Sequence, residues 1–238
     1  MIKYLSIAAL AAAFAVGGAW MLTRTNDGSD LSMTPLPGAA QAQETAADPV
    51  ADAPLDLASV IEMAEGSETA PVTIIEYLSY TCPHCAEFHA GQYQDLKPYI
   101  ADGRVRFVVR EVYQHRFGLW ASMVTRCSGD QMRFFGLTDV LFDTQRDWLG
   151  DGDPATVAAN LRTVGLTAGL EPAMLDACMA DEVKARTLIA WSEVNATASE
   201  VQGTPTLVIN DTTYANMSFT DLAGIIDPII AASDWTAP

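Results

Sequence analysis

Basic residues are scarce in this chain of 238 residues, which has 13 lysines and arginines against 30 aspartates and glutamates. Two of the basic residues, Lys3 and Arg24, lie in the first 24 residues, so the remainder carries 11 basic and 30 acidic side chains, a formal charge of −19. A chain this acidic repels phosphate backbones, which argues against nucleic acid as a partner. An acidic surface that keeps the protein dispersed is sufficient to explain the charge.

Histidine and cysteine are also few, at three and four residues. Two of the cysteines, Cys82 and Cys85, are separated by two residues, and only His84 and His89 among the histidines lie near them. A structural zinc site needs four ligands, so the sequence argues against zinc here, and it indicates no prosthetic group. Copper(I) binding stays open as an alternative because thiolates with a nearby imidazole suit this ion. A helical histidine four residues beyond Cys85 is, however, typical of a partly solvated surface position.

The motif Cys82-Pro83-His84-Cys85 follows an apolar run, residues 72–78, and opens a stretch with helical character. A dithiol between a strand and a helix is suited to redox exchange. Unpaired backbone N–H groups and the helix dipole would stabilise a thiolate on Cys82, and Pro83 suits the first helical position. His84 adds a cationic donor for the same sulfur. A disulfide between these cysteines should be reactive and strongly oxidising, whereas a purely structural bridge over so short a span is uncommon.

Three segments resemble the DsbA family of thioredoxin-fold thiol oxidases: Ala-Pro-Val-Thr-Ile-Ile-Glu-Tyr at 70–77, the motif at 82–85, and Gly-Thr-Pro-Thr-Leu-Val-Ile-Asn at 203–210. The resemblance covers about residues 55–235. It implies an α/β thioredoxin fold with an inserted helical subdomain, and an enzyme that donates disulfide bonds to exported proteins in the periplasm. Thr204 departs from the valine that these oxidases often carry there and resembles the isomerase branch, so a disulfide isomerase or reductase stays an alternative.

The resemblance also implies roles for residues around the motif. Pro205 would be cis and face Cys82 and Cys85, which leaves the adjacent backbone free to pair with an extended substrate. Glu76 would be a buried acid beneath the active site that exchanges a proton with Cys85. Burying an acid is costly unless it is paired or functional, and Arg110 on the neighbouring strand could pair with it. A merely structural ion pair is the alternative.

Cys127 and Cys178 are the other two cysteines. Four cysteines allow three pairings, and pairing Cys82 with Cys85 leaves Cys127 with Cys178. Because neither has a CxxC context, we interpret this pair as a structural bridge, worth roughly 4 kcal/mol for a loop of about fifty residues. A similar second bridge occurs in a subset of DsbA proteins from alpha-proteobacteria, which the low-lysine, alanine-rich composition also suits.

The remaining pattern predicts a thioredoxin core that is split by helices. Strands are predicted at residues 72–79, 105–112, 206–209 and 212–214, the last two joined by a turn at Asn210-Asp211, and helices at 82–100, bent near Pro98, and at 220–232. Residues 55–65 lead into this core. About residues 116–198 lack strand signals and have helical spacings, with Asp153-Pro154 and Glu171-Pro172 as helix starts.

The N-terminal segment contains no charged residue from Leu5 to Leu22, a length that just spans a bilayer and is long for a signal-peptide core. The small-x-small site Ala40-Gln41-Ala42 lies too far beyond it for ordinary cleavage. We therefore expect residues 1–24 to be an uncleaved membrane anchor rather than a cleaved signal peptide, and either would export the domain. Residues 25–54 have scattered prolines and no periodicity, and are expected to form a flexible linker.

The expected partners follow from the resemblance. They are reduced or unfolded exported proteins as substrates and a DsbB-like membrane oxidase that restores the disulfide. Isomerases of this kind usually dimerise through an added N-terminal domain, and residues 25–54 look too short and too unstructured to be one, so we expect a monomeric domain.

Overall fold

The computed structural model of the protein describes residues 54–236. The predicted anchor at residues 1–24, and all of the predicted linker at residues 25–54 except its last residue, lie outside the described residues. Among the described helices, none has the length and hydrophobicity that crossing a membrane requires.

A five-stranded sheet forms the centre of the described chain, in the order β1-β3-β2-β4-β5. Strands β2 (Val72–Leu78) and β3 (Val105–Glu111) are parallel, and β1 (Met63–Glu65), β4 (Thr206–Ile209) and β5 (Thr212–Ala215) join antiparallel. All four residues of β4 are buried, as is typical of a strand covered on both faces. The predicted two-residue turn is confirmed, because Asn210 and Asp211 have φ values of 42° and 71°, which such a hairpin turn requires. The edge strand β1 lies in the lead-in segment, where the sequence predicted no strand.

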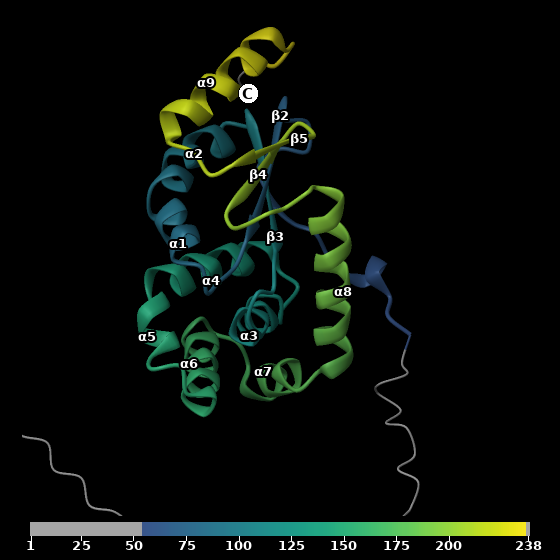
Figure 1. Ribbon diagram of the computed structural model, residues 1–238, viewed down its shortest axis with the longest axis vertical. Coiled ribbons are helices and arrows are strands. Elements are labelled where there is room, and N and C mark those ends of the chain that lie inside the picture. The colour runs from purple at the N-terminus through teal and green to yellow at the C-terminus, as the bar shows by residue number, and fades with distance from the viewer. Residues whose placement is uncertain (1–53, 237–238) are drawn as a thin grey trace, which may run out of the picture. The chain divides into compact units, whose positions relative to one another are not determined.

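The helix predicted over residues 82–100 is two helices, α1 (Pro83–Ala90) and α2 (Gln92–Ala101). Pro98 lies inside α2, so the predicted bend near it stays a prediction. The break between the two helices is at Gly91, whose φ of −118° and ψ of −91° are not helical. Glycine in a helix interior costs about 1 kcal/mol relative to alanine, which favours an interruption at this position. Helices α2 and α8 (Glu182–Ala198) both contact β3 and flank it on opposite sides (Figure 1), while α9 (Phe219–Ala232) contacts β2.

The chain between β3 and β4 is helical, which confirms the predicted insertion into a thioredoxin-like sheet. Its helices are α3 (Arg116–Thr125), α4 (Gln131–Asp143), α5 (Gln145–Leu149), α6 (Pro154–Thr167), α7 (Pro172–Met179) and α8. Helices α3 to α7 gather at one end of the sheet (Figure 1). Pro154 and Pro172 take the first position of their helices, as predicted, where the missing N–H leaves no helical hydrogen bond unmade. A short 3₁₀ helix, Leu57–Ser59, precedes β1.

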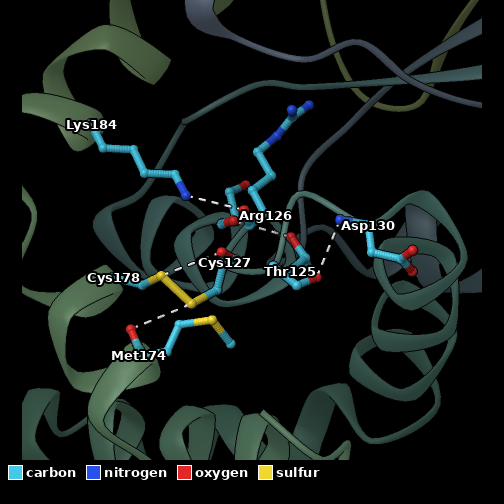
Figure 2. Close-up of a disulfide and its surroundings, with 9 residues drawn as sticks. Thr125, Arg126, Cys127, Asp130, Met174, Cys178 and Lys184 are labelled. Atoms are coloured by element: carbon cyan, nitrogen blue, oxygen red, sulfur yellow. Dashed lines mark hydrogen bonds between the residues drawn. A yellow bond between two sulfur atoms is a disulfide. The ribbon is translucent and has the colours of Figure 1, made fainter. Parts of the chain in front are cut away.

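The predicted second disulfide is present and joins Cys127, just after α3, to Cys178 of α7 (Figure 2). The neighbouring guanidinium of Arg126 is buried and donates to both carboxylate oxygens of Glu111, at 2.7 and 2.6 Å. Lys184 of α8 donates to the carbonyl of Arg126 at 3.0 Å (Figure 2). The disulfide therefore ties α7 to the end of α3, and Arg126 ties that end to the sheet.

Candidate active site

The Cys82–Cys85 pair lies where β2 gives way to α1. Cys82 is the residue immediately before α1, with Pro83 at the first helical position, and its N–H donates to the carbonyl of Ser79 at 3.0 Å. Cys82 is partly exposed, Cys85 is fully buried, and both carry free thiols. The structure thus presents one sulfur to solvent and keeps the other beneath it.

The environment of Cys82 favours the thiolate and lowers its pKa from 9.0 to about 5. The largest cause is a hydrogen bond from the thiol of Cys85, which lowers the pKa. Burial is the next largest effect and opposes it by raising the pKa. Hydrogen bonds from Thr204 and from the backbone N–H groups of Cys85 and His84 lower the pKa further. These backbone donors are the free N–H groups at the start of α1. Cys82 is therefore largely a thiolate at neutral pH, which is the nucleophilic form.

The imidazole of His84 does not donate the hydrogen bond to the sulfur of Cys82 that the sequence predicted, and has only a smaller electrostatic interaction with it. Its imidazole Nδ1 lies 2.9 Å from Oε2 of Glu87, both side chains are exposed, and this pairing is the main reason that its pKa is raised. The hydrogen bond that His84 gives to the sulfur of Cys82 comes from its backbone N–H. The expected cationic donor is thus wrong, since a carboxylate one helical turn away takes the imidazole.

Cys85 is held as a neutral thiol. Its pKa is raised far above the ordinary value, first by burial, then by its hydrogen bond to the sulfur of Cys82, and then by the nearby negative charge of Glu76. The two cysteines therefore differ in charge at neutral pH. This asymmetry is suited to thiol–disulfide exchange, in which one sulfur is attacked and the other leaves.

Glu76 is fully buried on β2, and its partner is His89 rather than Arg110. Oε2 of Glu76 lies 2.8 Å from Nε2 of His89 in the last turn of α1. Arg110 is opposite Tyr77 in the sheet register, one residue beyond Glu76, so its side chain is on the other face, where it donates to Glu62 and to the hydroxyl of Tyr77. The predicted Arg110 pairing is wrong for this reason, as is the expectation of a partly solvated His89.

The loop before β4 faces the active-site cysteines. The Thr204–Pro205 peptide bond is cis, and the carbonyl oxygen of Thr204 lies 3.3 Å from Sγ of Cys82. Proline has no N–H, so no backbone donor of residue 205 approaches the sulfur. Cys82 stays partly exposed beside this loop.

Gln145, in α5, is a residue that the sequence gave no signal for. Its side-chain amide is buried and donates to the carbonyls of Tyr80 and Cys82, both at 2.9 Å. One side chain of the helical insertion therefore holds the turn that carries Cys82. Its distance of 63 residues from Cys82 along the chain explains why local patterns did not reveal it.

Within residues 54–236, no group of three or more His, Cys, Asp or Glu side chains is arranged to hold a metal ion. The described site instead consists of a thiolate, a buried thiol and a buried acid–imidazole pair. Such a constellation can accept a disulfide, transfer it to a second dithiol and move the accompanying proton.

Comparison with known proteins places the chain in a family. A family model described as thioredoxin matches residues 58–228. A protein of Rickettsia bellii named "Putative protein-disulfide oxidoreductase" is 30% identical over 173 residues, which cover 72% of this chain and 66% of that protein. The match therefore spans slightly less than two thirds of that relative's own length.

Two solved structures show the same fold. Wolbachia pipientis alpha-DsbA1 superposes with a TM-score of 0.65 and 20% identity, covering 71% of this chain and 91% of that one. A protein-disulfide isomerase from Novosphingobium aromaticivorans gives a TM-score of 0.62 and 22% identity, and the match covers 72% of this chain and 99% of that one. At these identities the comparisons establish the DsbA-like fold, with its helical insertion.

Proposed function

This chain belongs to the thioredoxin family, and from that premise we propose that it is a thiol-disulfide oxidoreductase that donates disulfide bonds to exported proteins through Cys82 and Cys85. The observation that carries the proposal is the unequal pair of sulfurs. A thiolate on Cys82 with a pKa of about 5 is stable when released, which makes the disulfide form a strong oxidant.

The proposed reaction is thiol–disulfide exchange. A substrate thiolate attacks Sγ of Cys82, the bond between Cys82 and Cys85 breaks, and Cys85 leaves with the electron pair and gains a proton. The second thiol of the substrate, once deprotonated, attacks the substrate sulfur that is bonded to Cys82 and releases Cys82 as the thiolate. Two substrate thiols become one disulfide, and the protein becomes the dithiol.

The surrounding residues have supporting roles in this proposal. Pro83 and the backbone N–H of His84 shape the start of α1 around Cys82, and Glu76 exchanges the proton of Cys85. Thr204 and Pro205 form the loop along which an extended substrate would pair. The contact between the carbonyl of Thr204 and Cys82 supports this assignment.

The proposed setting is the periplasm, reached through the N-terminal segment, with reduced exported proteins as substrates. A DsbB-like membrane oxidase would take the electrons from the dithiol. The Rickettsia bellii relative, named for protein-disulfide oxidoreduction, supports the activity.

Isomerase activity is the second candidate, supported by Thr204 before the proline and by the Novosphingobium structure named for isomerisation. Disulfide donation requires Cys82 and Cys85 in the disulfide form, whereas isomerisation requires them as the dithiol. The low pKa of Cys82 favours the donor direction, because it stabilises the reduced product.

A refolding assay tests the proposal. The oxidised full-length protein should speed the return of activity to a reduced, denatured ribonuclease, and both Cys82→Ser and Cys85→Ser, which cannot carry the disulfide, should abolish the effect. Cys85→Ser should still form a mixed disulfide through Cys82 with ribonuclease that already holds scrambled disulfides, and Cys82→Ser should not. An isomerase would instead act, as the dithiol, on ribonuclease with scrambled disulfides. Equal refolding rates with wild-type protein and Cys82→Ser would reject the proposal.

A further inference from the structure

The buried pair formed by His89 and Glu76 is incompletely satisfied. The two side chains are 3% and 0% exposed, and one hydrogen bond of 2.8 Å joins them. Among the described residues, no partner meets the other carboxylate oxygen, Oε1, or the other ring nitrogen, Nδ1. Buried polar atoms without partners are costly, and in a pair this close to Cys85 they leave two sites that can gain or lose a proton.

His89 lies among features of the kind that stabilise a cation. It lies in the last turn of α1, where the helix dipole stabilises cations. Its ring centroid is 4.6 Å from that of Tyr93 and 4.4 Å from that of Phe142, distances at which aromatic rings attract a cation. Burial opposes the charge, and the carboxylate of Glu76 offsets that cost.

The charged and titratable groups around the pair come from several elements. Cys85 is on α1 itself, and Tyr93 on α2 donates its hydroxyl to Glu65 of β1. Glu65 interacts electrostatically with His89, and with Lys97 and Asp139 beyond it. The face of α4 that meets the imidazole is the apolar ring of Phe142. Glu76 is therefore the acid bonded directly to the imidazole, and Cys85 is the reacting group next to the pair.

The charge balance at this site shows why an imidazole matters. When Cys85 forms a thiolate beside an ionised Glu76 alone, two negative charges share a buried site, which is unfavourable. With a protonated His89, the charges of Cys85, Glu76 and His89 add up to one negative charge. If the imidazole were absent, burial would favour the neutral carboxylic acid, which cannot accept the proton of Cys85.

We propose that His89 is a positioning residue that keeps Glu76 ionised, so that the pair can take the proton from Cys85 and return it. This inference rests on the proposed function and deepens it. When Cys85 attacks a mixed disulfide at Cys82, its proton passes to Glu76 and then to solvent. In disulfide donation the pair gives a proton to the leaving Cys85 thiolate and regains one from solvent, so protons and charge balance in both directions.

The test uses the reduced full-length protein mixed with oxidised glutathione. Cys82 first forms a mixed disulfide with glutathione, and Cys85 then displaces it. Acid quenching and mass spectrometry follow the two steps separately from pH 5.5 to 8.5. We expect His89→Gln to leave the first step unchanged and to slow the second about tenfold at pH 7, with a rate that rises nearly tenfold per pH unit because hydroxide must remove the proton.

A double-variant comparison separates this role from a structural one. Glu76→Gln should slow the second step as His89→Gln does, and adding His89→Gln to Glu76→Gln should change that step less than twofold, because the two residues act as one unit. In the double variant the two glutamine side chains at positions 76 and 89 can still hydrogen-bond to each other. Comparing it with Glu76→Gln therefore tests the role of His89 even if His89→Gln alone fails to fold. His115→Gln, at an exposed histidine, is the matched control and should follow the wild-type profile.

Three results would overturn the inference. They are a His89→Gln profile that overlies the wild type, a further tenfold loss in the double variant, or an equal effect of His115→Gln. Failure of the proposed function looks different, because wild-type protein would then not form the mixed disulfide at Cys82 at all.

Discussion

Raising the pH from 5 to 8 should stabilise the dithiol form of this protein against unfolding relative to its disulfide form. The cause is Cys82, whose pKa falls from 9.0 to about 5 on folding. A group with a depressed folded pKa contributes stability that is fully present above the unfolded value and is lost as the pH falls through the folded value. The contribution therefore grows between pH 5 and pH 9. The disulfide form has no Cys82 thiolate, so it lacks this contribution to stability.

The magnitude follows from the pKa difference. At pH 7 the pH is about two units above the folded pKa, which corresponds to about 2.7 kcal/mol. Cys82 is partly exposed, and solvent screening reduces this to about 1–2 kcal/mol. We expect this to make the dithiol form the more stable of the two at neutral pH, although a disulfide ordinarily stabilises a fold.

Urea unfolding monitored by tryptophan fluorescence, at pH 5, 6, 7 and 8 with and without reductant, measures the difference. The protein carries Cys127→Ala and Cys178→Ala, so that the reductant changes only the Cys82–Cys85 bond. Groups that titrate alike in both forms cancel, and the range stops at pH 8 because Cys85, with its raised pKa, destabilises the folded dithiol at higher pH. Cys82→Ser should remove the pH dependence, whereas His84→Ala should change it little, because its imidazole bonds to Glu87. A gap that stays constant or shrinks from pH 5 to pH 8 would refute the reasoning.

Three further predictions concern other parts of the chain. Replacing both Cys127 and Cys178 by alanine should lower the free energy of unfolding by about 3–4 kcal/mol in urea titrations, and graded reduction with peptide mapping should open Cys82–Cys85 before this bridge, the reverse order speaking against a structural role. Gln145→Leu, which leaves the carbonyls of Tyr80 and Cys82 without their donor, should destabilise the protein by about 1–3 kcal/mol and slow mixed-disulfide formation in the glutathione assay, and unchanged values would show that the turn holds itself. An uncleaved segment from Leu5 to Leu22 predicts that the protein stays with membranes after carbonate washing, and an intact mass that starts near Gln43 would instead indicate cleavage.

The sequence predicted best the features that depend on neighbouring residues. The start of α1 at Pro83, the turn at Asn210-Asp211 and the helix starts at Pro154 and Pro172 each follow from backbone preferences within a few positions. The two central strands were evident from the apolar run at residues 72–78 and from the alternating pattern at residues 105–112.

Features that depend on distant pairing were missed or wrong. The partner of Glu76 was assigned to Arg110 because both are in adjacent strands, but the register places Arg110 beside Tyr77 and on the other face. His89 lies one helical turn beyond Cys85 and so shares its buried face, a signal that was available but was outweighed by the expectation of a solvated histidine. Nothing local marked Gln145, since its role requires α5 to pack against the active-site turn.

The most direct test of the proposed disulfide donation is the redox state of Cys82 and Cys85 in living cells. Acid trapping followed by alkylation with a mass-tagged maleimide separates the dithiol from the disulfide, and Cys127 and Cys178 serve as the internal control. A donor of disulfides predicts that Cys82 and Cys85 are mostly oxidised at steady state and become reduced when the membrane oxidase that serves them is removed. A pair that is mostly reduced in wild-type cells would contradict the account and indicate an isomerase or reductase.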